Sequence, residues 1–121
     1  MTQFSNNRAY DLEERTEKFG EEVVEFCNKL KPTIVSTPLI GQLVRSVTSI
    51  GANYMEANNA SSKKDFRNKI YICKKETEET KHWLRMLAEC YLEHKERMRI
   101  FWKEAQELEK IFQKIVNSLN A

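Results

Sequence analysis

The sequence predicts an all-α protein built as an antiparallel, up-down-up-down four-helix bundle. Apolar residues recur three and four positions apart along the chain, and the alternation that is typical of strands is missing. Gly and Pro number only 3 and 2 among 121 residues, so few positions break a helix. The breaks leave four helical segments, residues 8–30, 38–59, 62–92 and 96–119, and short connections make neighbouring helices antiparallel. A chain of this length suits one domain over residues 1–121.

The first segment, residues 8–30, has a clear beginning and a clear end. Asn7 or Asp11 is placed to cap it, and the Glu residues that follow suit the positive end of a helix dipole. Lys31-Pro32 ends the helix, because proline lacks an amide donor and restricts the residue before it. The apolar stripe comprises Leu12, Phe19, Val23, Phe26 and Leu30.

The second segment, residues 38–59, carries the most regular stripe. We expect Thr37 as its N-cap and Pro38 as its first helical residue, where a missing amide is not needed. The polar run that begins at Asn58 ends it. The stripe comprises Ile40, Leu43, Val47, Ile50, Tyr54 and Ala57.

The third and fourth segments, residues 62–92 and 96–119, are separated by the least marked break. Ser62 and Asp65 form a variant of the capping box, with Asp in place of Glu. Neither Gly nor Pro stands near residues 93–97, so this boundary depends on a change in the phase of the stripe. The stripes comprise Phe66, Ile70, Cys73, Thr77, Thr80, Leu84, Leu87 and Tyr91, and then Phe101, Ala105, Leu108, Phe112, Ile115 and Leu119.

The helices carry more apolar surface than one stripe each requires. A wider core within a monomer would absorb part of it, since globular helices often bury a third position per heptad. Large apolar side chains beside the stripes are also typical of a partner interface, and we expect a homo-oligomer. The expected interface residues are Leu39, Val44, Ile72, Trp83, Met86 and Trp102.

The net charge is only +2, but the basic residues are unevenly distributed. Between residues 60 and 75, Asp65 is the one acidic residue among six basic ones, which are Lys63, Lys64, Arg67, Lys69, Lys74 and Lys75. A second cluster is expected at the opposite end of the bundle, and acidic neighbours dilute it. It comprises Lys95, Arg97 and Arg99, beside Glu93 and Glu96.

Lys63, Lys64 and Arg67 have no acidic residue three or four positions away, and they lie in the first turns of a helix, where the dipole disfavours cations. Two interpretations remain open. The three side chains pair with the acidic side chains of residues 11–14, which lie at the same end of an antiparallel bundle. Alternatively, they bind an anion together with the helix amides, and a phosphate backbone is the obvious large anion.

The sequence contains no constellation for catalysis or metal binding, and we expect no enzymatic activity, metal or cofactor. Cys27, Cys73 and Cys90 form no C-x-x-C pair, and His82 and His94 show no H-E-x-x-H spacing. No apolar run approaches the ~18–20 residues that cross a bilayer, and the amino terminus lacks the apolar centre of a secretion signal. We therefore expect a soluble, cytoplasmic protein that makes no contact with membranes.

Two segments have a distinctive order of residues. The first runs from Leu43 to Ala57 and reads LVRSVTSIGANYMEA, and the second runs from Asp65 to Leu84. Both resemble the bacterial four-helix-bundle proteins related to those encoded in 23S rRNA intervening sequences. This resemblance implies rings of five bundles with no assigned enzymatic activity. It also implies kinship with accessory proteins of diversity-generating retroelements, which are more basic and bind nucleic acid and a reverse transcriptase.

Taken together, residues and resemblance predict a non-enzymatic, oligomeric bundle that binds RNA or other nucleic acid through a basic face on the third helix. Arg45 matches the family's hallmark arginine. The expected phosphate contacts are Arg45, Lys63, Lys64, Arg67, Lys69 and Lys74. The alternative is a protein–protein adaptor without direct nucleic-acid binding, in which the basic face meets an acidic partner and Trp83 or Trp102 anchors an apolar patch.

Overall fold

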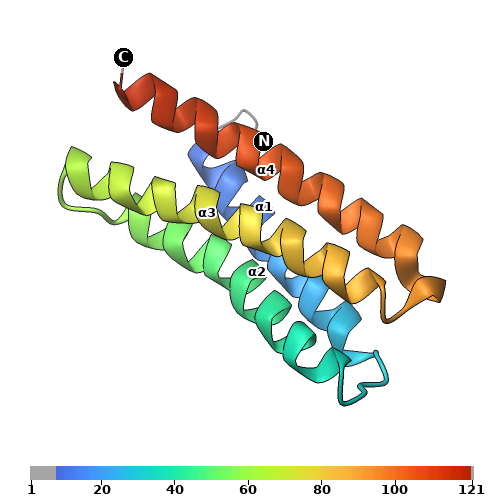
Figure 1. Cartoon of the computed structure of the whole chain (residues 1–121). Coiled ribbons are helices and arrows are strands. Elements are labelled where there is room, and N and C mark those ends of the chain that lie inside the picture. The colour runs from blue at the N-terminus through green and yellow to red at the C-terminus, as the bar shows by residue number, and fades with distance from the viewer. Residues whose placement is uncertain (1–7, 121) are drawn as a thin grey trace.

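The computed structural model describes residues 8–120, with side chains from residue 12 onward, and it forms a four-helix bundle (Figure 1). Helices α1 (Arg8–Asn28), α2 (Ser36–Asn58), α3 (Lys63–Ala88) and α4 (Lys95–Asn120) follow one another in alternating directions. A single 3₁₀ turn, η2 (Leu92–His94), precedes α4. The predicted all-α bundle is confirmed. None of the helices within the described residues has an apolar stretch long enough to cross a membrane.

The core is built from the apolar stripes. Most predicted stripe positions are buried, and the largest fully buried side chains include Phe19, Leu43, Ile50, Leu108 and Phe112. The stripe of α4 also buries Met98 and Val116, which the sequence analysis did not include. Five predicted core positions are half-buried: Phe26, Ile40, Phe66 and Ile115 pack against the edge of the core, and Leu119 lies near the end of α4.

Buried hydroxyl groups lie within this core, and each has a partner. Thr80 Oγ1 donates to Ser46 Oγ at 2.9 Å, which joins α3 to α2, and Ser46 Oγ donates to the Leu43 carbonyl at 3.2 Å. Thr77 Oγ1 donates to the Lys74 carbonyl at 2.6 Å. Because buried polar groups are costly only when they lack partners, these hydroxyls are compatible with a stable core.

Helix α2 begins differently from the prediction. The N-cap expected at Thr37 and the first helical residue expected at Pro38 are both wrong, because the helix begins at Ser36. Thr33 and Ser36 instead cap each other: the Ser36 amide donates to Thr33 Oγ1 at 3.0 Å, and the Thr33 amide donates to Ser36 Oγ at 2.8 Å. Tyr91 Oη lies 2.8 Å from Ser36 Oγ and donates to the Lys31 carbonyl at 2.6 Å, which holds the α1–α2 and α3–α4 connections together.

Helix α3 begins as predicted and ends early. The Asp65 amide donates to Ser62 Oγ at 3.0 Å, which confirms the cap at Ser62. The helix ends at Ala88 rather than at residue 92, because the buried Tyr91 turns inward to the hydrogen bonds just described.

Candidate anion-binding surfaces

The side chain of Arg45 lies between α2 and α3 and is held there by two carboxylates. Its Nη1 atom lies 3.3 Å from both carboxylate oxygens of Glu76, and its Nη2 atom donates to Glu79. Glu76 is buried and Arg45 is half-exposed. A buried carboxylate requires a counter-charge, so Arg45 is engaged by the bundle itself.

Lys69 and Lys74 are also engaged in ion pairs. Lys69 Nζ lies 2.7 Å from Glu56 Oε1 of α2, and this hydrogen bond raises the pKa of Lys69. Lys74 Nζ lies 3.0 Å from Glu78 Oε2, one turn further along α3, and the bond lowers the pKa of Glu78. The pair between Lys69 and Glu56 joins two helices, which the i,i+4 rule does not detect.

Lys63, Lys64 and Arg67, the α3 start cluster, have no ion pair with any side chain of residues 12–120. Lys63 and Lys64 are exposed, and Arg67 is half-buried. The expected partner Glu13 accepts a hydrogen bond from Asn58 Nδ2 at 3.0 Å instead. Glu14, a second expected partner, forms no ion pair with a side chain of residues 12–120, and the side chain of Asp11, the third, lies outside those described. The cations stand in the first turns of α3, whose amide dipoles favour a negative charge nearby.

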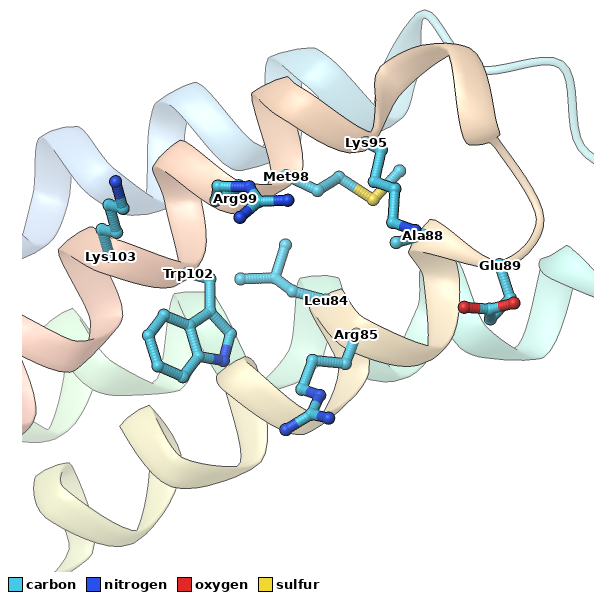
Figure 2. Close-up of a pocket in the computed structure, with 9 residues that line it drawn as sticks. All are labelled: Leu84, Arg85, Ala88, Glu89, Lys95, Met98, Arg99, Trp102 and Lys103. Atoms are coloured by element: carbon cyan, nitrogen blue, oxygen red, sulfur yellow. The ribbon is translucent and has the colours of Figure 1, made fainter.

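A second group of cations surrounds a groove between the end of α3 and the beginning of α4 (Figure 2). The groove has a volume of about 480 Å³. Four basic residues line it, Arg85 from α3 and Lys95, Arg99 and Lys103 from α4, and Glu89 is its one acidic residue. The rest of the lining is apolar and comprises Leu84, Ala88, Met98 and Trp102. We call this the α3/α4 groove.

The α3/α4 groove combines expected and unexpected residues. Lys95 and Arg99 belong to the second basic cluster of the sequence analysis, whereas Arg97 lies over the Phe101 ring, 4.8 Å from its centroid. Arg85 and Lys103 were missed. Lys95, Arg99 and Lys103 stand at i, i+4 and i+8, so a search for one-sided basic rows would have found the α4 side of the groove.

Comparisons with known proteins give the chain a family. The model of the 23S rRNA-intervening sequence protein family matches residues 8–114. The chain belongs to this family. A solved structure, a protein of unknown function from the S23 ribosomal protein family of Bacteroides thetaiotaomicron, is 30% identical and has a TM-score of 0.76. That match covers 87% of this chain and 97% of the other, and no curated protein matches.

In this member of the 23S rRNA-intervening sequence protein family, the residues expected at an oligomer interface are dispersed. Four of them pack half-buried against the core, namely Leu39, Val44, Trp83 and Trp102. Met86 is 40% exposed and Ile72 is half-buried. By helical spacing, Ile72 and Met86 share the flank of α3 that carries Glu79, whereas Trp102 lines the α3/α4 groove.

The most exposed apolar side chains lie at the end of the bundle that holds the α1–α2 and α3–α4 connections. Ile34, Val35 and Leu92 are 93%, 63% and 65% exposed. Tyr91 links the two connections, so these side chains stand on neighbouring loops. Helical periodicity does not reveal these side chains, because they lie outside the helical stripes.

Within the described residues, no group of three or more His, Cys, Asp and Glu side chains is placed to hold a metal ion. Burial raises the pKa of the Cys27 thiol to about 11 and that of the Cys73 thiol to about 12, so both are protonated near neutral pH. His82 packs against Trp83, with ring centroids 4.8 Å apart.

Proposed function

We propose that this chain is a non-enzymatic helical bundle that binds RNA or other nucleic acid through phosphate contacts, made first by the α3 start cluster. One observation carries the proposal: Lys63, Lys64 and Arg67 have no carboxylate partner among residues 12–120. Arg45, Lys69 and Lys74 have such partners, and we assign Arg45 and Lys69 to joining α2 to α3 and Lys74 to an ion pair within α3.

Physical reasons favour an anion at the α3 start cluster. Three cations beside the positive end of a helix dipole repel it and one another, and a phosphate would relieve both costs. Releasing counterions from the nucleic acid adds to the affinity. The sequence-independent nature of phosphate contacts predicts little preference among RNA sequences at this cluster.

Charge reversal tests the proposal. The variant Lys63→Glu/Lys64→Glu/Arg67→Glu is expected to bind a structured RNA at least 10-fold more weakly than the unmodified protein in the same low-salt buffer. A control with the same change in net charge is Lys18→Glu/Lys29→Glu/Lys75→Glu, three exposed cations without ion pairs in the described part of the chain. This control is expected to bind the RNA with an affinity within about 3-fold of that of the unmodified protein. Equal losses in both variants would remove the cluster from the proposal.

We further propose that the chain self-associates, which would multiply the α3 start cluster by symmetry and add avidity. The exposed Met86 on the outer flank of α3 and the resemblance to proteins that form rings of five support this. Light scattering at micromolar concentration is expected to show a multiple of the 14.3 kDa chain, reduced by Met86→Glu. A 14.3 kDa particle for the unmodified protein contradicts it.

An adaptor is the second candidate, and a specific observation favours it. Ile34, Val35 and Leu92 form an exposed apolar surface on neighbouring loops, which suits a protein partner. A pull-down that survives nuclease, yields one protein in stoichiometric amount and is abolished by Ile34→Ser/Leu92→Ser supports the adaptor. Loss of the captured material on nuclease treatment supports nucleic-acid binding instead.

We place this function in the cytoplasm. Cys27, Cys73 and Cys90 are free thiols, and the first two are buried. A chain with three unpaired thiols suits a reducing compartment. Fractionation of cells that express the chain, followed by immunodetection, tests the location.

A further inference from the structure

We propose that the α3/α4 groove binds a nucleotide, with its phosphate on the surrounding cations and its base against Trp102. The site is at the other end of α3 from the α3 start cluster: Lys64 and Arg85 are 21 positions apart, about 30 Å along the helix. The inference therefore goes beyond the proposed function and does not depend on it.

The charge of the groove calls for an anion. Arg85, Lys95, Arg99 and Lys103 surround it and Glu89 alone opposes them. Across residues 12–120, the one ion pair that these cations form is a 3.9 Å contact between Arg99 Nε and Glu96, both well exposed. An exposed contact of that length contributes little. Four largely uncompensated charges around one groove repel one another, and a ligand with a phosphate group would reduce that repulsion.

The two arginines add geometry to the charge. A guanidinium group offers paired donors in one plane and binds phosphate oxygens two at a time, whereas lysines supply point charges. In the view of Figure 2, Arg99 of α4 lies beside Met98 and above Leu84, and Arg85 of α3 lies below Leu84. A phosphate between the two helices would meet donors from both sides.

The floor of the groove explains why the ligand carries more than a phosphate. Because Leu84 and Met98 are only 1% and 2% exposed, the half-buried indole of Trp102 is the main apolar surface that a ligand could contact. A bare inorganic anion gains nothing from an apolar floor, but a nucleobase stacks on or packs against an aromatic ring. The volume of about 480 Å³ lies within the usual range for small-ligand sites.

The indole is held in place before any ligand arrives. Lys81 Nζ lies 5.1 Å from the centroid of the Trp102 ring and 2.6 Å from Glu109 Oε1, so an ion pair fixes the cation over the ring. The buried Leu84 and Met98 support the floor from the core. A preformed floor lowers the ordering cost of binding to that of the exposed rim side chains.

A peptide helix fits this groove less well. The floor is almost wholly buried apart from Trp102, so an amphipathic helix would find little apolar area to cover. Stable protein–protein contacts need roughly 800 Å² on each partner. The groove favours a compact ligand that combines an anion with an aromatic ring.

Titration calorimetry at low salt tests the proposal with defined probes: adenosine monophosphate, adenosine, inorganic phosphate and an eight-nucleotide single-stranded RNA. Adenosine monophosphate is expected to bind at least 10-fold more tightly than either adenosine or phosphate. Lys95→Ala/Lys103→Ala, which changes two exposed side chains, is expected to weaken it at least 5-fold with an unchanged melting temperature. Trp102→Phe is expected to weaken adenosine monophosphate but leave phosphate binding unchanged.

The same probes distinguish a free nucleotide from a nucleic-acid strand as the ligand. They also distinguish binding in the α3/α4 groove from binding at the α3 start cluster. Tighter binding of the RNA than of adenosine monophosphate assigns the groove to a strand, and equal binding assigns it to a free nucleotide; either supports the site. The variant Lys63→Glu/Lys64→Glu/Arg67→Glu is expected to bind adenosine monophosphate normally. Phosphate binding as tightly as adenosine monophosphate, or a Glu-rich octapeptide binding more tightly in a groove-dependent way, overturns the assignment.

Discussion

The charge of Arg45 suggests a role in binding nucleic acid, but its side chain stabilises the contact between α2 and α3. The guanidinium group contacts the buried carboxylate of Glu76 and also Glu79, which joins α2 to α3 through their charged flanks. Without it, Glu76 would be a buried carboxylate with no counter-charge. The exposure of Arg45 itself, 46% of its side chain, leaves this pair partly solvated.

Replacing Arg45 is therefore expected to lower stability rather than RNA affinity. Arg45→Ala should reduce the free energy of unfolding by roughly 1–2 kcal/mol, less than for a fully buried pair because solvent reaches Arg45. Adding Glu76→Gln should recover part of the loss. The matched control Lys74→Ala removes an exposed i,i+4 pair and should cost at most about 0.5 kcal/mol. Urea denaturation measures all three, and unchanged stability with weakened RNA binding would contradict the assignment.

Cys73 behaves as a small apolar side chain within the α2–α3 contact. Its Sγ atom lies 3.6 Å from the Ile50 carbonyl oxygen, and its exposed fraction is zero. Burial raises the pKa of the thiol from its ordinary value of 9.0 to about 12. The folded state thus keeps the proton at a pH where the unfolded chain loses it.

This difference predicts that stability falls in alkaline solution. The contribution of Cys73 is complete below pH 9, the ordinary pKa of the thiol, and is lost as the pH rises toward 12, at up to about 1.4 kcal/mol per pH unit. Urea denaturation of the unmodified protein and of Cys73→Ala between pH 7 and pH 10 measures the difference. The stability advantage of the unmodified protein should shrink above pH 9, and a constant advantage would show that Cys73 ionises as readily folded as unfolded.

At the scale of the helices, the apolar spacing was enough to predict which faces are buried, but not where α2 begins or α3 ends. Core positions follow from local periodicity, which one sequence shows directly. The start of α2 depends on Ser36, which exchanges hydrogen bonds with the nearby Thr33 and whose hydroxyl also meets Tyr91, 55 positions away in sequence. The early end of α3 depends on the same contact. Contacts of this range are set by the tertiary fold.

The candidate sites likewise include features that local sequence predicts and features that depend on contacts between helices. The exposed α3 start cluster was visible from the absence of acidic neighbours along the helix. The engagement of Arg45 and Lys69 by Glu76 and Glu56 was not visible, because these pairs join different helices. The α3/α4 groove could not be predicted from one helix, because its basic lining combines Arg85 of α3 with a row of three cations on α4.

Substitution of Gly41 tests how much helix propensity in α2 contributes to the stability of the protein. It is exposed within the helix, and a Cβ atom there would have no neighbour within 4 Å. Gly41→Ala is expected to raise the free energy of unfolding by about 0.5–1 kcal/mol through helix propensity, seen as a melting temperature a few degrees higher. Gly51 is the matched comparison within the same helix, because a Cβ atom there would be in ordinary van der Waals contact with α1, 3.5 Å from Thr16 Oγ1. Destabilisation by Gly41→Ala would show that another chain approaches this backbone.

For the whole molecule, the distribution of charge matters more than its sum. A net charge of +2 creates no general attraction to nucleic acid. Two groups of cations that are largely without carboxylate partners among residues 12–120 lie at the two ends of α3, in the α3 start cluster and around the α3/α4 groove, whereas Arg45, Lys69 and Lys74 pair with Glu76, Glu56 and Glu78 along its middle. The nucleic-acid binding that we propose would therefore depend on these local surfaces.

The salt dependence of RNA affinity tests this central claim most directly. Binding of a labelled single-stranded RNA is measured between 50 and 200 mM salt for the unmodified protein and for Lys63→Glu/Lys64→Glu/Arg67→Glu. If the protein makes three phosphate contacts, the logarithm of its association constant should fall with the logarithm of the salt concentration at a slope of about −2 or steeper. The slope for the variant should be shallower by about 2. Absence of binding at low salt, or the same slope in both proteins, would contradict the claim that the α3 start cluster binds phosphates.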